Sequence, residues 1–225
     1  MRISFESWRG YYGAYFLGEA KGAELIRRLA DFTPGPAELR WIKTWAEEEE
    51  KHHRLWGELV AKKGTEVKRD LGTLSGVYAI TEGFVDGKNW TGAMVGAGII
   101  EHVSSCAAHY LYPHADSDTR RVFDVILNDD IGHIAFDLAQ IRKIASAPQG
   151  AKSVVEVHKK FLAEVLEWPL RKGLLDGELA ILNNAYTLHR NSLAEFGVML
   201  PEIVFENTLG YRIKKRVMEA LSRVI

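Results

Sequence analysis

The sequence contains very little cysteine, since Cys106 is the only one among 225 residues. A single thiol excludes an internal disulfide framework, which suits a reducing compartment such as the cytosol. It also excludes an iron–sulfur electron-transfer cluster built from this chain alone, because such clusters need several thiolates. No flavin or nicotinamide fingerprint is evident either. Redox chemistry in this protein would therefore depend on electrons delivered from outside.

Excess charge of one sign and long apolar runs are also absent. Lys and Arg number 29, Asp and Glu number 30, and the net charge of −1 does not fit a strongly basic nucleic-acid binder. No apolar run reaches the roughly 18 residues of a membrane span, and the N-terminus lacks the apolar region of a signal peptide. We expect a soluble, cytoplasmic protein in which residues 1–225 form one domain, because no stretch has the composition of a linker.

Helical periodicity dominates what is present. Apolar residues recur about every 3.6 positions and no convincing period-two stretch appears, which predicts an all-α protein. Four long helices are expected, at 4–30, 37–62, 91–111 and 118–146. A crossover at 66–90 with a short helix at 74–84 would join the second to the third. Further amphipathic segments follow at 152–171, 177–196 and 201–224. The predicted fold is a four-helix bundle with additional C-terminal helices.

Two of these helices carry a carboxylate and a histidine three residues apart. Glu49 and His52 form the first pair, and Asp130 and His133 form the second. Residues at this spacing lie on one face of a helix, so both side chains can reach one metal ion. One such pair is weak evidence, because many are solvated salt-bridging faces. Two pairs on two helices of one bundle predict a metal site.

The other two long helices each carry one glutamate inside an apolar stripe. Glu19 interrupts the first helix, and Glu101 follows Ile99 and Ile100 in the third. A carboxylate on a buried face must be paired or metal-bound, because an uncompensated buried charge is costly. Two carboxylate-x-x-His helices plus one inward glutamate on each of two others form the ligand set of di-metal bundles.

The register of the first pair has an alternative. Helical rotation places Glu49 near the centre of the apolar stripe of residues 37–62 and His52 near its edge. Glu50 with His53 has the same spacing and stays open as a second candidate pair.

The ligand chemistry favours redox-active iron or manganese. Four carboxylates would neutralise two divalent ions inside a bundle, and two neutral imidazoles would add no charge. Six ligands over two ions leave open positions, which suit iron or manganese. Zinc sites more often contain a majority of His or Cys. Small and aromatic residues one turn from the glutamates, namely Tyr15, Gly22 and Ala97, are expected to wall a substrate pocket.

The chain resembles the aldehyde-deformylating oxygenases, a ferritin-like di-iron family, over residues 11 to 140. In its second half it carries the order Ile100-Glu101, His109, Pro113, Asp116, Arg120 and Asp129-Asp130-x-x-His133. In its first half it carries Gly18-Glu19 and Glu49-x-Lys51-His52, followed by Arg54 and Trp56. One position departs from the family pattern, since Asp130 stands where the motif has Glu.

This resemblance implies a ferritin-like fold with two iron ions, or manganese or a mixed pair. The implied ligands are Glu19, Glu49, His52, Glu101, Asp130 and His133. The implied activity is oxidation of an apolar substrate such as a fatty aldehyde by O₂, with electrons from a ferredoxin or reductase. Fold alone does not settle function. Non-enzymatic iron storage, a di-iron hydroxylase of another substrate and a purely structural bundle are the alternatives.

Overall fold

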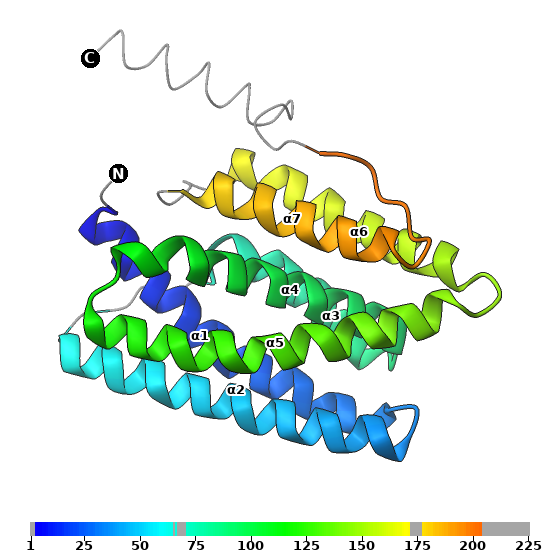
Figure 1. Ribbon diagram of the computed structural model, residues 1–225, viewed down its shortest axis with the longest axis horizontal. Coiled ribbons are helices and arrows are strands. Elements are labelled where there is room, and N and C mark those ends of the chain that lie inside the picture. The colour runs from blue at the N-terminus through cyan, green and yellow to red at the C-terminus, as the bar shows by residue number, and fades with distance from the viewer. Residues whose placement is uncertain (1–2, 65, 67–70, 172–176, 204–225) are drawn as a thin grey trace, which may run out of the picture.

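The computed structural model describes residues 3–64, 66, 71–171 and 177–203, and every regular element in these ranges is helical (Figure 1). The α-helices are α1 (Phe5–Leu29), α2 (Pro36–Lys63), α3 (Ser75–Asp86), α4 (Trp90–Leu111), α5 (Ser117–Ala145), α6 (Gly150–Arg171) and α7 (Glu178–Ala194). The predicted all-α class is confirmed. Of the helix expected at 201–224, residues 201–203 are not helical and the remainder lies outside the described residues.

Local sequence signals set the helix ends. Pro36 occupies the first turn of α2, where its missing N–H would have no partner in the helix anyway. Gly64 closes the same helix with φ of 58°, a left-handed conformation that glycine adopts without strain. The side chains of Asn89 and Asp116 cap α4 and α5 by accepting hydrogen bonds from backbone N–H groups three residues on. These caps fix where the two long site-bearing helices start.

The helices form a bundle with a second layer. In Figure 1, α1 and α2 run side by side, and α5 lies between α2 and α6. Helix α4 packs against α3, α5 and α7, so it is covered on several sides. No helix in the described part of the chain is long and apolar enough to cross a membrane.

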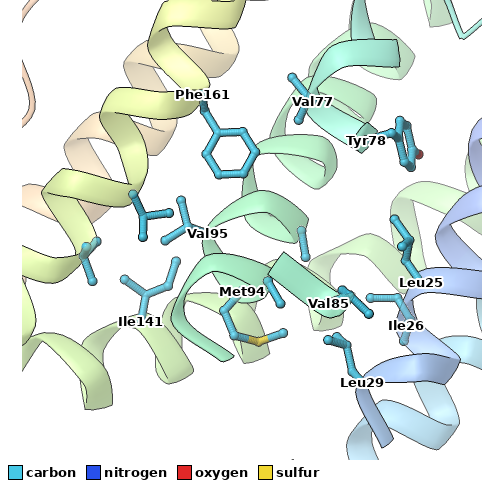
Figure 2. Close-up of a cluster of buried hydrophobic side chains, with 14 of the residues drawn as sticks. Leu25, Ile26, Leu29, Val77, Tyr78, Val85, Met94, Val95, Ile141 and Phe161 are labelled. Carbon is cyan, nitrogen blue, oxygen red and sulfur yellow. The ribbon is translucent and has the colours of Figure 1, made fainter. Parts of the chain in front are cut away.

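Two apolar clusters fill the interior. One joins residues of all the helices from α1 to α7, and Figure 2 shows Leu25, Met94, Ile141 and Phe161 among its side chains. The other is aromatic, with Tyr15 stacked on Trp56 at 4.8 Å between ring centroids. Seven buried polar residues of α1, α2, α4 and α5 occur between members of these two clusters: Glu19, Glu49, His52, Glu101, Ser105, Asp130 and His133. The clusters therefore enclose a polar layer in the middle of the bundle.

Glycines let α4 approach its neighbours closely. A Cβ at Gly96 would overlap the Thr81 side chain of α3 and touch Phe161. Gly96→Ala is therefore expected to lower the free energy of unfolding by about 1–3 kcal/mol through overpacking. Gly83→Ala is the matched control, because a Cβ there meets nothing within 4 Å, and it should stabilise α3 by roughly 0.5–1 kcal/mol. Urea unfolding of both variants measures the contrast, and equal effects would contradict the packing argument.

Three buried histidines connect α4, α6 and α7. His102 Nδ1 donates to the carbonyl of Gly98 at 2.7 Å, and His158 Nδ1 donates to that of Val154 at 2.8 Å. His189 lies between them, with Nε2 2.8 Å from His158 Nε2 and Nδ1 3.3 Å from His102 Nδ1. Burial lowers the pKa of all three, that of His158 to about 4. The three rings are therefore neutral at neutral pH.

This histidine cluster makes the fold sensitive to acid. Between pH 6.5 and about 4, an unfolded chain binds a proton at His158 that the folded protein does not bind. The free energy of unfolding therefore falls as the pH falls through this window, by about 3 kcal/mol for this residue. His158→Gln should remove that part of the slope in urea unfolding measured from pH 7 to pH 4. A slope identical to that of the unsubstituted protein would contradict the assignment.

Candidate metal centre

The polar layer brings together the six candidate ligands expected from the sequence. Four helices supply them, and each is at most 7% exposed: Glu19 from α1, Glu49 and His52 from α2, Glu101 from α4, and Asp130 and His133 from α5.

Five of the six form two overlapping groups. In one group, ligand atoms of Glu19, Glu49 and His52 lie within 4.8 Å of one another. In the other, ligand atoms of Glu49, Glu101 and His133 do so. Glu49 belongs to both groups, so its two carboxylate oxygens are placed to bridge two ions.

Asp130 joins neither group but lies beside the second. Its Oδ1 is 3.7 Å from His133 Nδ1, and its Oδ2 accepts a hydrogen bond from Ser105 at 2.7 Å. Aspartate is one methylene shorter than the glutamate of the family motif. The buried hydroxyl of Ser105 holds this shorter side chain in place.

The two histidines each present one nitrogen with no hydrogen-bond partner. His52 Nδ1 lies 3.5 Å from a Glu19 oxygen, and His133 Nδ1 lies 3.5 Å from a Glu49 oxygen. These distances are long for hydrogen bonds. They match the separation of two donors on one metal ion, because each donor sits roughly 2 Å from the metal. The unpaired buried nitrogens and their carboxylate neighbours therefore fit a metal centre.

The other ring nitrogens are held by acids on the opposite helix. His52 Nε2 on α2 donates to Asp129 of α5 at 3.0 Å, and His133 Nε2 on α5 donates to Glu48 of α2 at 2.9 Å. We call this arrangement the crossed support. With a metal ion bound, this arrangement would keep the proton on Nε2 and leave the lone pair of Nδ1 for the metal. Lys51 pairs with Asp129 and keeps that carboxylate charged.

Electrostatics favour cations in this layer. Burial raises the pKa of Glu19 and Glu49 well above the usual range, and burial together with Glu101 raises that of Asp130 to about 7. Burial alone would lower the pKa of His133, but the surrounding carboxylates raise it to about 10. Without metal these groups retain protons. Divalent ions would displace them, so binding should release protons and strengthen as the pH rises.

The alternative pair points away from the candidate centre, toward α1. Glu50 forms an exposed ion pair with Arg27 of α1. His53 Nδ1 donates to the carbonyl of Phe16 at 2.8 Å and packs against its ring. The structure therefore brings Glu49 and His52 into the interior, and leaves Glu50 and His53 on the side of α2 that meets α1.

A cavity of about 460 Å³ adjoins the four carboxylates. Glu19, Glu49, Glu101 and Asp130 all line it, whereas His52 and His133 do not. Its other walls include the apolar side chains of Ala14, Ile100, Val103, Ala107, Ile181 and Leu182. This volume is typical of small-molecule sites. The open side of the candidate centre therefore faces a largely apolar cavity.

The three residues expected to wall the pocket lie in different places. Tyr15 lines the cavity, and its hydroxyl donates to the carbonyl of Ser104 at 2.8 Å. Gly22 and Ala97 are not among the lining residues. A Cβ at Gly22 would lie 2.7 Å from Glu49 Oε2, so this glycine makes room for a candidate ligand instead of a substrate.

Several residues of the site were not identified from the sequence. Glu48 and Asp129 each precede a candidate carboxylate, and this repeated acidic pair was a visible signal. Ser105 lies one turn after Glu101, on the same face of α4. Trp45 donates its indole N–H to Glu49 Oε1 at 2.9 Å from one turn away. Asp137 is fully buried beside Gly98, and burial raises its pKa well above the usual range.

Comparison with known protein families and with curated protein sequences finds no match. Among solved structures, the chain is similar to "Protein 19 with aldehyde deformylating oxidase activity from Synechococcus". The TM-score is 0.67 at 18% sequence identity, covering 91% of this chain and 94% of that one. We conclude that the chain has the ferritin-like fold of an aldehyde-deformylating oxidase, which confirms the resemblance seen in its sequence.

Proposed function

We propose that this protein is a non-haem di-metal oxygenase that uses O₂ and external electrons to oxidise an apolar substrate such as a fatty aldehyde. The observation that carries the proposal is the position of the four carboxylates. They line one largely apolar cavity, whereas the two candidate histidines do not line it and instead place Nδ1 next to the carboxylates of Glu19 and Glu49. Two metal ions held by these residues would lie next to the cavity that would receive the substrate. The activity of the Synechococcus protein points to the same substrate class.

The residues have distinct roles in this proposal. Glu19 with His52 and Glu101 with His133 would each hold one ion, Glu49 would be shared by both groups, and Asp130 would add a carboxylate beside His133. Bound iron, manganese or a mixed pair would supply the activation of O₂. The crossed support orients the imidazoles, and Ser105 orients Asp130. The apolar cavity walls would exclude water from the reacting atoms and align an aliphatic chain with the carboxylates.

The register of α2 gives a direct test of the ligand set. His52→Ala is expected to lower the metal content from two ions per chain to one, because its Nδ1 faces Glu19. His53→Ala should keep both ions, since its Nδ1 bonds a backbone carbonyl. Metal analysis after loading with ferrous iron measures the difference. The opposite result would move the ligands to Glu50 and His53.

The reaction is tested with iron-loaded protein, a chemical reductant and a panel of aldehydes and fatty acids. Oxygen consumed together with formate and alkane released would support deformylation. A hydroxylated product would support an oxygenase that hydroxylates its substrate instead of deformylating it. The shorter side chain of Asp130, at the position where the family motif has Glu, is the reason to test for this product. Oxygen uptake with iron deposition and no organic product would instead support iron storage.

A further inference from the structure

A continuous stack of aromatic rings joins the candidate centre to the protein surface. Trp45 packs on the His133 ring with centroids 4.9 Å apart and an interplanar angle of 23°. Phe136 meets Trp45 edge-on at 6.1 Å. Trp41 stacks on Phe136 at 5.1 Å and 18°. We call these four residues the Trp41 stack.

The two ends of the Trp41 stack differ in environment. Trp45 is fully buried, and its N–H bonds Glu49, so its ring contacts two candidate ligands. Trp41 is 39% exposed, an unusual position for a large apolar ring. The stack therefore runs from candidate ligands to solvent through side chains of α2 and α5, which lie side by side in Figure 1.

The backbone of α5 is shaped to receive the exposed ring. Trp41 lies over Gly132, where a Cβ would sit 3.1 Å from the indole. The surrounding surface of α5 carries no charge, since the exposed residues between Asp130 and Ile141 are Ile131, Ala135 and Ala139. Ile131 is 71% exposed. On the α5 side, the outer end of the stack thus borders accessible apolar side chains, while the exposed Arg40 and Lys43 of α2 flank Trp41 in the sequence.

We propose that the Trp41 stack is the path by which electrons pass from a one-electron donor at the surface to the metal centre. This inference rests on the proposed function, which requires electrons that a chain with one cysteine cannot store in a cluster of its own. The donor class is a reduced iron–sulfur protein. Each transfer oxidises one donor cluster by one electron and reduces one ferric ion to ferrous. Two transfers reduce both ions.

Packed rings suit this role because electronic coupling decays more slowly through contacting π systems than across gaps. The second aromatic cluster also approaches the site, through Tyr15 and Trp56. Its chain of ring contacts ends at Trp8, which is half-buried. Trp8 therefore provides a control of the same residue type that is not part of the Trp41 stack.

The test uses photochemical reduction of the full-length, iron-loaded protein in its diferric form. A ruthenium sensitiser is attached to a cysteine introduced by Ala139→Cys, in a Cys106→Ser background. After a flash with a sacrificial donor present, the bleaching of the ferric absorption reports the rate of electron arrival. Trp41→Leu should slow this rate by at least an order of magnitude, and Trp8→Leu should leave it unchanged. Circular dichroism and iron content verify that both variants are folded and loaded.

Phe136→Leu provides a second variant, which should slow transfer from the same sensitiser by interrupting the stack at its middle. Equal rates in the Trp41→Leu and Trp8→Leu proteins would overturn the proposal. This readout does not depend on turnover. If the protein forms no organic product but Trp41→Leu slows electron arrival, the electron path is supported and the proposed function is refuted. If the protein is an active oxygenase but Trp41→Leu and Trp8→Leu give equal rates, only the electron path is refuted.

Discussion

Asp130→Asn is expected to stabilise the metal-free protein at neutral pH and to weaken metal binding. Burial and Glu101 raise the pKa of Asp130 from 3.8 to about 7. Between these values the folded protein holds a proton that the unfolded chain has released, so the free energy of unfolding falls as the pH rises through this window. Asparagine is neutral throughout and avoids this loss. The expected gain above pH 7 is roughly 2–4 kcal/mol.

Urea unfolding of chelator-treated protein at pH 5 and pH 8 measures this effect. The gain should appear at pH 8 and shrink at pH 5, where the Asp130 carboxyl is already protonated. Asp129→Asn is the matched control at the neighbouring position. Lys51 and His52 hold the pKa of Asp129 below its usual value despite partial burial, so its substitution should destabilise instead. Destabilisation by both variants would refute this account.

Ala14→Phe and Gly22→Phe are expected to abolish turnover for different reasons. Ala14 lines the cavity but is not a candidate ligand, so a phenylalanine there should fill space needed by a long-chain substrate and leave two ions bound. At Gly22, even a Cβ would lie 2.7 Å from Glu49 Oε2. Gly22→Phe should displace Glu49 and lower the metal content as well.

Metal analysis and turnover, measured together, separate the two effects. Gly22→Ala is the milder test, because it adds only the Cβ that approaches Glu49. Full metal content in Gly22→Phe together with lost turnover would place Gly22 on the substrate path, as the sequence argument expected. Unchanged turnover of every substrate in Ala14→Phe would remove the cavity from the reaction.

Local signals predicted most of the fold. The helices expected at 37–62 and 118–146 agree with α2 and α5 to within one residue at each end. Pro36, Gly64 and Asp116 set these ends through local backbone and capping preferences that do not depend on the rest of the molecule. The predicted placement of each carboxylate and histidine on one helix face also agrees with the structure, since residues three apart share a face in any α-helix.

The rotation of one helix against another and the contacts between residues far apart in the sequence could not be predicted from residue spacing. Gly22 lies one turn from Glu19, but whether it faces the cavity or Glu49 depends on how α1 rotates against α2. The buried histidine cluster joins residues of α4, α6 and α7 that share no local pattern. The Trp41 stack similarly required the packing of α2 on α5 to become visible.

The crossed support links positions far apart in the sequence, with a separation of 85 positions from Glu48 to His133 and of 77 from His52 to Asp129. A change at either member leaves a polar group on the other helix without its partner. Substitution of one member of a pair is therefore expected to be accompanied by substitution of the other, so homologous sequences should retain or lose both members together.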